Sequence, residues 1–377
     1  MERERIKPRA NWQSSLESVG FSFHSLGGVY WDESTCYHFS SDQIDILEAA
    51  TSELHEMSLA AVENIVKRGA FEPFALADGF AEYVAASWRA RASSLYGRLD
   101  LCYDGKTPSK LREYNADTPT SLIEAAVAQW NWLQAVHPES DQFNSLHEKL
   151  IARWTEIRAA LAGIPPVLYF SCVKDNEEDL GNLEYLRDTA LQAGIDARHI
   201  YVEDIGWSEP QQCFVDLDMN PIRALFKLYP WEWVTHDEFG PRVPRSQLSV
   251  IEPPWKILLS CKAILPVLWE LYPDHPNLLP AYFEPGKLGE RYVRKPLYSR
   301  EGANVEIHGR HGVCAQPGTY GAEGYIFQAY APLPEFDGNY PVIGSWLVGD
   351  LAAGIGIRED TSPITGNTSR FVPHYFD

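Results

Sequence analysis

Apolar residues recur at helical spacing over much of the first 160 positions. After the capping pair Ser41-Asp42, apolar side chains return every three or four residues. This spacing predicts an amphipathic helix that runs to about Lys67 and stops at Gly69. The same spacing predicts three further helices, over residues 73–91, 121–136 and 143–162. We therefore expect the first part of the chain to be mainly helical.

Other stretches have the pattern of strands. Residues 98–103 and 110–115 alternate on either side of a turn, which predicts a hairpin with many polar groups on one face. Further along, an apolar run at 167–171, a helical stretch at 182–194 and a second apolar run at 199–202 follow one another. Strand, helix and strand at this spacing predict a right-handed βαβ unit, and hence a small parallel sheet in the middle of the chain.

The order of these patterns predicts a mixed α/β (α+β) protein. A short strand is expected at 214–217, and from Arg291 onward the pattern is mostly that of strands. No long flexible linker interrupts the chain, so we expect interlocked parts and not separable domains. The predicted parts are N-terminal helices with the polar hairpin over 1–160, an α/β unit over 161–250 and a strand-rich part over 251–377.

Composition narrows the classes of partner. Hydrophobic residues make up 45% of the 377 positions, which excludes a disordered chain. The 32 basic and 52 acidic residues give a net charge of −20 without a long basic run. This balance argues against nucleic acid and anionic membrane surfaces as partners. It suits amine-bearing small molecules, but a spread negative charge is also ordinary for solubility. The sequence does not determine the oligomeric state.

Cysteine spacing and the apolar segments indicate the compartment. The six cysteines lie far apart with no CxxC pair, which argues against a zinc cluster or a disulfide scaffold and favours a reducing environment. The start of the chain lacks the apolar segment of a secretion signal. The most apolar stretch, residues 255–272, is interrupted by charged residues and proline. We therefore expect a soluble, cytoplasmic protein.

The predicted hairpin carries the first candidate chemistry. Side chains two positions apart on a strand share a face, so Arg98 lies beside Asp100, and Glu113 lies beside Asn115 on the partner strand. If the two faces coincide, three oxygen ligands gather next to one guanidinium. Such a set suits Mg²⁺, which prefers carboxylate and amide oxygens. The alternative is a solvated hairpin face with an incidental ion pair.

Two lysines are candidates for phosphate binding. Lys262 lies where an apolar helix is predicted to begin, near free N–H groups that favour an anion. Lys295 lies in a predicted strand, ahead of a loop that contains Ser299, Gly302 and Asn304 and whose N–H groups suit phosphates. The alternatives are a surface lysine on an amphipathic helix and a hairpin loop without function.

Two strand residues of the last part are further candidates. Gln328 is the single amide of an apolar strand, where it suits the edge of an adenine or, alternatively, a cross-strand side-chain bond. Arg358 lies near the end of a strand and suits a phosphate or a carboxylate. Its alternative partners are the neighbouring Glu359 and Asp360.

Five motifs in this order resemble the glutathionylspermidine synthetase family, and in particular its shorter members that lack the amidase half. The resemblance extends from about residue 12 to the C-terminus, and the EYNAD run is its most specific element. The motifs are Gly97–Asp100 (GRLD), Glu113–Ser121 (EYNADTPTS), Lys262–Pro266 (KAILP), Val293–Pro296 (VRKP) and Gly356–Glu359 (GIRE).

The resemblance implies an ATP-grasp core preceded by a Rossmann-like unit, with ATP and Mg²⁺ as cofactors. Asp100, Glu113 and Asn115 match metal ligands, and Arg98 matches the arginine that stabilises the transition state. The positions that match ATP-binding residues are Arg98, Lys262, Lys295, Ser299, Gly302, Asn304 and Gln328. The positions that match substrate-binding residues are Thr118, Thr120, Glu177, Glu178 and Arg358, the last also with a catalytic role.

The implied activity is that of an acid–amine ligase. In this reaction ATP phosphorylates a carboxylate, and an amine then displaces the phosphate to form an amide. A glutathione-like peptide and a polyamine are the substrates that the family suggests, but residues 229–233 (YPWEW) stand where hydroxyl-bearing glutathione contacts are expected. Two alternatives stay open, namely a phosphotransferase that stops at the phosphorylated product and a non-catalytic ATP-binding protein. Retention of the whole charged set argues against the second.

Overall fold

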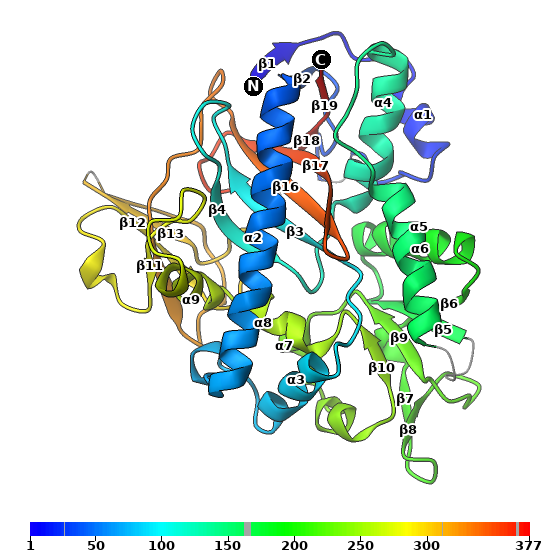
Figure 1. Ribbon diagram of the computed structural model, residues 1–377. Coiled ribbons are helices and arrows are strands. Elements are labelled where there is room, and N and C mark those ends of the chain that lie inside the picture. The colour runs from blue at the N-terminus through cyan, green and yellow to red at the C-terminus, as the bar shows by residue number, and fades with distance from the viewer. Residues whose placement is uncertain (26, 162–166, 311, 367–368) are drawn as a thin grey trace.

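The fold is built around a long helix and a central antiparallel sheet. The computed structural model describes residues 1–25, 27–161, 167–310, 312–366 and 369–377. In Figure 1 helix α2 (Ser41–Arg68) lies in front of the central sheet, and a second antiparallel sheet lies to its left. A parallel sheet occupies the lower right, and the two chain ends meet at the top. The mixed α/β class predicted from the sequence is confirmed.

Helix α2 has the bounds that its sequence predicts. The Ser40 side chain accepts a hydrogen bond from the Gln43 backbone, and the Gln43 side chain bonds back to Ser40, which forms a capping box. Gly69 ends the helix in a left-handed conformation with φ 63°, which a residue without Cβ adopts at little cost. Its apolar stripe, including Leu47 and Leu54, is fully buried. This stripe packs against the central sheet.

The central sheet joins strands that are more than 200 residues apart in the chain. The predicted hairpin is confirmed, and its first strand pairs antiparallel with a strand from the C-terminal part. Because of this pairing, the polar hairpin and the last part of the chain share one sheet. In the order β18-β17-β16-β3-β4, the strands are Arg370–Val372, Leu351–Asp360, Tyr340–Val348, Tyr96–Cys102 and Lys110–Asn115.

The second antiparallel sheet carries one of the candidate lysines. Its order is β11-β15-β12-β13-β14, and Lys295 on β12 pairs in register with Ile326 on β15. The loop with Ser299, Gly302 and Asn304 connects β12 to β13. In chain order from β11 to β15, the strands are Ala281–Tyr282, Tyr292–Pro296, Glu306–Gly309, Gly312–Ala315 and Tyr325–Ala329.

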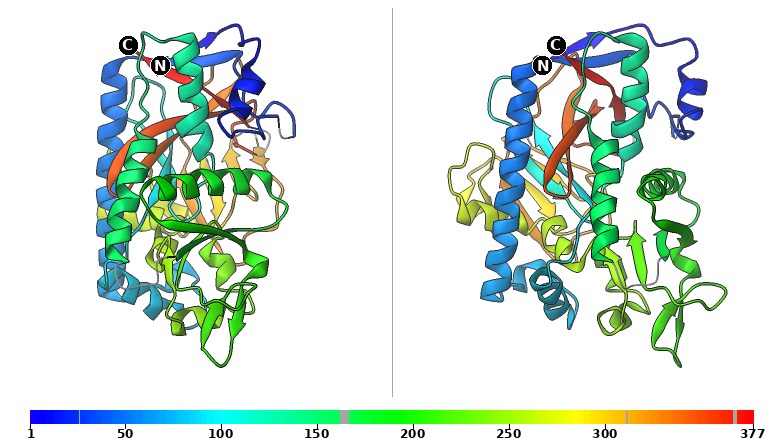
Figure 2. Two further views of the ribbon diagram at one scale, coloured as in Figure 1. Left: turned by 90° about the vertical axis from the view of Figure 1, so that its right-hand side faces the viewer. Right: turned by 45° about the vertical axis from the view of Figure 1, so that its right-hand side comes forward.

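The predicted parallel sheet is present in the middle of the chain. Both views of Figure 2 place it at one side of the molecule, below the terminal strands. It has the order β10-β9-β5-β6, with strands Ser249–Ile251, Ala224–Lys227, Val167–Cys172 and Asp196–Tyr201. Helix α6 (Glu177–Gln192) packs on β5 and β6. The expected strand at 214–217 is the shorter β8 (Cys213–Val215), which pairs with β7 (Gly206–Ser208) outside this sheet.

Several predicted helix bounds are wrong, because of backbone conformation, capping and one contact with a distant strand. In the 73–91 segment, α3 begins only at Phe80, because Ala75 and Gly79 both have positive φ. In the 143–162 segment, α5 (Leu146–Ala160) begins later, because the Phe143 carbonyl accepts a hydrogen bond from the Ile355 backbone. Residue 162 lies outside the described residues. The 182–194 helix begins earlier, at Glu177, because the Asn176 side chain caps it.

The remaining elements are short. Helix α4 (Gln129–Val136) continues a π-helical turn, Glu124–Ala128, so the helix predicted over 121–136 is confirmed apart from its first residue. The other helices are α1 (Trp12–Glu17), α3 (Phe80–Arg89), α7 (Trp231–Val234), α8 (Ile257–Ser260) and α9 (Ile264–Leu271). The terminal sheet has the order β1-β2-β19, with strands Glu2–Arg5, Thr35–Phe39 and His374–Phe376.

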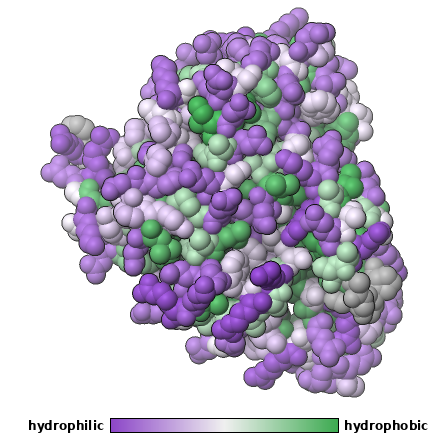
Figure 3. Space-filling model, in the orientation of Figure 1, coloured by the Kyte–Doolittle hydropathy of each residue, from purple (hydrophilic) through white to green (hydrophobic). Residues whose placement is uncertain are grey.

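The surface and the helices bear on possible partners. The face shown in Figure 3 is mostly polar, and its apolar side chains lie in small separate groups, as on an ordinary protein surface. Among the described residues, every helix is either too short or too polar to span a bilayer. All six cysteines are free thiols, as their spacing predicts.

Candidate active site

The polar faces of the two hairpin strands coincide. In the antiparallel register, Asp100 lies opposite Glu113, and Arg98 lies opposite Asn115. Directly opposed residues of a sheet project from the same face, so all four side chains lie together. The sequence predicts the two pairs, and the structure brings them side by side.

Arg98 is held firmly at the base of this group. Its side chain is 8% exposed, and its guanidinium lies 5.5 Å from the centre of the Trp346 ring. Arg98 Nε donates to Asp100 Oδ1 over 2.7 Å, and Nη1 donates to the Thr120 carbonyl over 2.7 Å. Gly344 on the neighbouring strand leaves room for it, because a Cβ there would lie 2.7 Å from Arg98 Cδ. The guanidinium is therefore fixed before any ligand binds.

Both candidate lysines reach the same hairpin. Lys262 Nζ lies 3.3 Å from Glu113 Oε2 and donates to the Ser299 carbonyl over 3.0 Å. Lys295 Nζ donates to the Arg112 carbonyl over 2.7 Å and to Gln328 Oε1 over 2.8 Å. The predicted position of Lys262 just inside a helix is wrong, because it lies in the turn between α8 and α9. The helix begins only at Ile264, because Cys261 has an extended backbone and the Lys262 N–H donates to the Leu297 carbonyl.

Opposite charges set the ionisation of this group. Burial raises the pKa of Glu113, but Lys262, Lys295 and Arg98 together outweigh it and lower this pKa to about 2. Burial lowers the pKa of Lys295 to about 7, against the opposing effect of Glu113. Two buried lysines lie beside one carboxylate, so the lysines carry more positive charge than this carboxylate can balance. This excess suits a polyanionic ligand.

A cavity of about 60 Å³ lies at the meeting point of the two antiparallel sheets. The hairpin, the strand of Lys295 and the following loop all contribute to its wall. Its lining includes Asp100, Arg112, Glu113, Lys295, Ser299 and Gly302. The predicted oxygen group and the predicted lysines therefore lie on the same side of the molecule.

The loop between β12 and β13 is anchored at several points. Gly302 has φ 69°, and a Cβ there would lie 2.6 Å from the Thr365 carbonyl oxygen, so only glycine fits. Asn304 Nδ2 donates to the Tyr320 carbonyl. Arg300, which sequence reasoning did not single out, donates to Thr118 Oγ1 over 2.9 Å and lies 3.3 Å from Glu232. This arginine ties the loop to the segment that follows the hairpin.

Arg358 lies next to the same site, and neither of its neighbours in sequence is its partner. Glu359 pairs instead with Arg3 and Arg370. Arg358 Nη2 donates to the Gly366 carbonyl over 3.1 Å, whereas its buried Nε has no partner among the described residues. Arg358 and Arg98 both line a second small cavity of about 20 Å³. The ion pairs proposed as the alternative for Arg358 are therefore wrong.

The two predicted acids at the start of α6, Glu177 and Glu178, differ in their exposure to solvent. Glu177 is exposed, whereas Glu178 is half-buried and raises the pKa of Arg98 and of nearby acids. Burial and Glu178 raise the pKa of Asp179 to about 6. Glu178 and Asp179 therefore face the site, and Glu177 faces solvent. Sequence reasoning missed Asp179, although it directly follows the predicted pair.

Glu124 is a further acid that sequence reasoning missed. Its side chain is 1% exposed, Tyr30 donates to its Oε1 over 2.5 Å, and its Oε2 has no partner among the described residues. Burial and Glu178 raise the pKa of Glu124 to about 8. The signal in the sequence is a single acid in an otherwise apolar helical stretch. The π-helical turn that places it inward is not visible in the periodicity.

Glu124→Gln is expected to change how stability depends on pH. Wild-type Glu124 stays protonated in the folded protein but ionises in the unfolded chain, so its contribution to stability is lost as pH rises from 4.5 to about 8. Glutamine does not titrate. Relative to wild type, the free energy of unfolding of Glu124→Gln should therefore increase across this window, by on the order of 5 kcal/mol.

Urea unfolding at a series of pH values measures this difference. Glu177→Gln, the same change of carboxyl to amide on the exposed start of α6, is the control and is measured over the same pH range. Parallel stability curves for Glu124→Gln and wild type would contradict the assignment of a buried, protonated carboxyl group.

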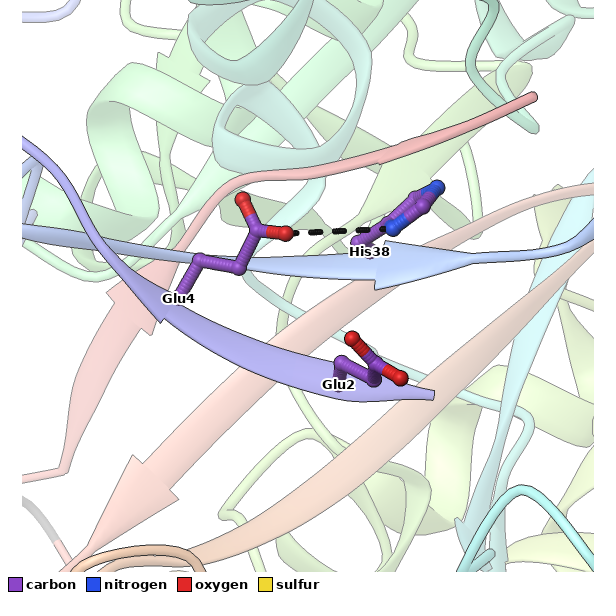
Figure 4. Close-up of side chains that lie close together, drawn as sticks. All are labelled: Glu2, Glu4 and His38. Carbon is purple, nitrogen blue, oxygen red and sulfur yellow. Dashed lines mark ion pairs between the residues drawn. The ribbon is translucent and has the colours of Figure 1, made fainter.

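The hairpin face fits a magnesium ion by its donor chemistry. Asp100 and Glu113 offer carboxylate oxygens, and Asn115 offers an amide whose buried Nδ2 has no partner among the described residues. Hard oxygen donors of this kind are those that Mg²⁺ prefers. A separate group, Glu2 and Glu4 of β1 with His38 of β2, lies in the terminal sheet, where Glu4 Oε1 is 3.8 Å from His38 Nδ1 (Figure 4). No described feature connects that group to the hairpin site.

Comparison with known proteins identifies the family. Residues 3–377 match the family described as "Glutathionylspermidine synthase preATP-grasp". This chain belongs to that family. The resemblance that the motifs carry is thereby confirmed, and as a member of the glutathionylspermidine synthase family the protein is a ligase.

Named relatives cover the chain almost completely. A Haemophilus influenzae protein named "Putative acid--amine ligase" is 44% identical over 98% of this chain and 97% of its own length. The trypanothione synthetase of Crithidia fasciculata is 27% identical over 98% of this chain, which spans 62% of that enzyme. The bifunctional glutathionylspermidine synthetase/amidase of Escherichia coli is 28% identical over 86% of this chain, which spans 56% of it.

A solved structure supports the fold alone. The apo form of a glutathione synthetase-like effector from Globodera pallida superposes with a TM-score of 0.60 at 10% identity, over 99% of this chain and 98% of that one. The ATP-grasp fold predicted for this member of the glutathionylspermidine synthase family is therefore confirmed. Such low identity says nothing of the ligands.

Proposed function

We propose that this ligase joins a carboxylate to an amine, with ATP cleaved to ADP and phosphate. One observation carries the proposal: Lys262, Lys295 and Arg98 converge from different elements on the carboxylates of a single hairpin. A triphosphate brought there meets fixed cations, and a metal meets fixed oxygen ligands. Simple nucleotide binding does not require both sets.

The proposed reaction has two steps. The substrate carboxylate attacks the γ-phosphorus of ATP and forms an acyl phosphate with release of ADP. The amine then attacks the acyl carbon, forms the amide and releases phosphate. Mg²⁺ bound at Asp100, Glu113 and Asn115 would neutralise charge on the phosphates. Arg98 and the two lysines stabilise the charge that spreads over the transferring group.

An acyl phosphate must be kept from water, because water hydrolyses it. We assign the exclusion of water to the loop between β12 and β13. Ser299 and Gly302 of this loop line the cavity, and Arg300 joins the loop to Thr118 and Glu232. A loop anchored on the opposite wall covers the reacting atoms and excludes water. Gln328 has its amide bonded to Lys295 and to the Leu111 carbonyl, so its proposed adenine contact requires an exchange of partners.

Charge distribution supports an amino-acid-like acid and a cationic amine. Arg358 lies next to Arg98, and its Nε has no partner within the described part of the chain, which suits a substrate carboxylate. Glu178 lies near Arg98 and Asp179 lies near Arg300, and these two acids suit an ammonium group. Names of the relatives include glutathionylspermidine, so we propose a glutathione-like peptide as the acid and a polyamine-like compound as the amine. The six free thiols support the cytoplasmic location expected from the sequence.

Coupled release of ADP tests the proposal against the phosphotransferase alternative. Purified protein with ATP and Mg²⁺ is given the acid alone, the amine alone, both, or neither. We expect sustained ADP release, and an amide detected by mass spectrometry, only when both are present. A stable phosphorylated acid formed without amine would favour the phosphotransferase. An absence of ADP release with every acid–amine pair of this class would favour the binding protein.

A further inference from the structure

A second and larger cavity lies in the parallel sheet, outside the nucleotide site. It has a volume of about 380 Å³ and adjoins the carboxyl ends of β5 and β9, next to Ser171 and Lys227. Ligands of open α/β sheets characteristically bind at this edge, and the volume is within the usual range for small-molecule sites. Most of its wall is apolar, with Phe214, Ile222, Leu225, Val243 and Val250 among the lining residues.

The mouth of this cavity is acidic. Glu203, Asp237 and Glu238 line it, all three are exposed, and no described lysine or arginine forms an ion pair with them. Among the described lining residues Lys227 is the one lysine or arginine, and Asp117 neutralises it, with Oδ1 2.6 Å from Lys227 Nζ. An apolar chamber with a negative mouth is complementary to a molecule with a hydrocarbon body and a cationic end.

An adjoining cavity leads from this mouth toward the nucleotide site. It has a volume of about 350 Å³ and shares Tyr229 and Asp237 with the first. Its wall adds Trp233, Tyr298 and Glu232, and Glu232 lies 3.3 Å from Arg300 in the loop between β12 and β13. Aromatic faces and carboxylates together attract ammonium groups. The two cavities thus adjoin each other, and the second reaches Glu232, which contacts the loop between β12 and β13 through Arg300.

The wall of the larger cavity is fixed to the active site. Asp117, two residues beyond Asn115, accepts hydrogen bonds from Lys227 Nζ and from the Trp231 backbone N–H, the latter over 2.7 Å. All three groups are buried. A ligand seated against Lys227 and Trp231 therefore has a defined position relative to the hairpin.

We propose that the amine substrate is a long-chain diamine with an uninterrupted hydrocarbon segment, bound along these two cavities. This inference deepens the proposed function and rests on it. The hydrocarbon segment crosses the larger cavity, with one ammonium group at Glu203, which lines only that cavity, and the reacting amine beyond Asp237 toward Glu232. A compound with a charged nitrogen inside the segment must desolvate that charge among apolar side chains, and it therefore binds more weakly.

Calorimetric titration with two matched amines tests this inference without ATP or turnover. 1,8-Diaminooctane and spermidine have the same length, but spermidine has a secondary amine within the chain. We expect 1,8-diaminooctane to bind at least tenfold more tightly, because only spermidine buries an internal charge. Spermidine binding with equal or higher affinity would overturn the proposal.

Two variants locate the binding. Val243→Phe fills the larger cavity and should weaken 1,8-diaminooctane at least tenfold, with a smaller effect on spermidine. Asp237→Asn removes one exposed charge at the mouth and should weaken both diamines several-fold, whereas Asp45→Asn on the exposed face of α2 should weaken neither. Unchanged affinity of 1,8-diaminooctane for Asp237→Asn and for a folded Val243→Phe would also overturn it.

Failure of this inference is separable from failure of the proposed function. If spermidine binds better while acid and amine still release ADP together, the ligase stands and the hydrocarbon preference is wrong. If 1,8-diaminooctane binds as expected but no acid–amine pair releases ADP, the cavity assignment stands as a binding site and the ligase proposal is wrong.

Discussion

Replacing Lys295 with alanine is expected to lower turnover by roughly a hundredfold or more, with the fold preserved. Lys295 is 4% exposed, and its ammonium lies between the Arg112 carbonyl and Gln328 Oε1 at the wall of the phosphate cavity. No other described lysine occupies that wall. Loss of a fixed cation at the transferring phosphoryl group removes on the order of 3 kcal/mol of transition-state stabilisation. ADP release with acid and amine both present measures the effect.

The control for this variant is Lys287→Ala. Lys287 is an exposed lysine in the turn that precedes the strand of Lys295, and it lies outside the cavity. Its removal should leave turnover within about twofold. Circular dichroism and thermal unfolding of Lys295→Ala establish that the variant is folded, and Lys295→Met repeats the test with the volume kept. Unchanged turnover in either Lys295 variant would remove the phosphate site from its proposed place.

Glu113→Gln is expected to raise the Mg²⁺ concentration needed for half-maximal activity at least about tenfold and to lower turnover at saturating Mg²⁺. The two side chains have nearly the same shape, so the change is mainly one of charge. The low pKa of Glu113, about 2, means that wild type carries the full negative charge at every working pH. Removal of that charge weakens metal binding and leaves Lys262 without its carboxylate partner at 3.3 Å.

Mg²⁺ titration of the ADP-release rate gives the comparison. Glu290→Gln, an exposed acid of the same polypeptide whose partner is Arg310, serves as the matched control and should keep the wild-type Mg²⁺ requirement. An unaltered Mg²⁺ dependence in Glu113→Gln would mean that the hairpin oxygens hold no metal, and that the carboxylate serves only to pair with Lys262.

Much of the site could be predicted from local sequence, and the hairpin shows why. Alternation of polar and apolar residues fixes which side chains share a face, so the pairs at Arg98 and Asp100, and at Glu113 and Asn115, follow from spacing alone. The glycine that ends α2 is likewise a local signal, and that helix has nearly its predicted limits, although the cap is Ser40 with Gln43 and not the predicted pair Ser41-Asp42. The starts of α3 at Phe80 and of α5 at Leu146 could not be predicted from the local sequence. Positive φ values decide the first, and a contact with a distant strand decides the second.

Partners of the buried charges could not be predicted. Arg358 has Glu359 and Asp360 beside it in sequence, but alternation on β17 sends Glu359 to the opposite face, where Arg3 and Arg370 bind it. Glu124 appears as an ordinary helical residue until a π-helical turn and Tyr30 enclose it. The motif resemblance identified the family and suggested phosphate-binding roles for the two lysines. Spacing alone left these lysines open between phosphate binding and a surface position.

The amino-acid sequence by itself determined the strand faces, the long helix, the excess of acid and the family motifs, because each depends on residues close together in the chain. The tertiary structure alone decided that the lysines of two distant segments meet the hairpin carboxylates, and that an apolar cavity with an acidic mouth opens beside them. Both depend on how sheets pack across more than 100 residues of chain. Charge and burial act through space, so neither is readable from position along the sequence.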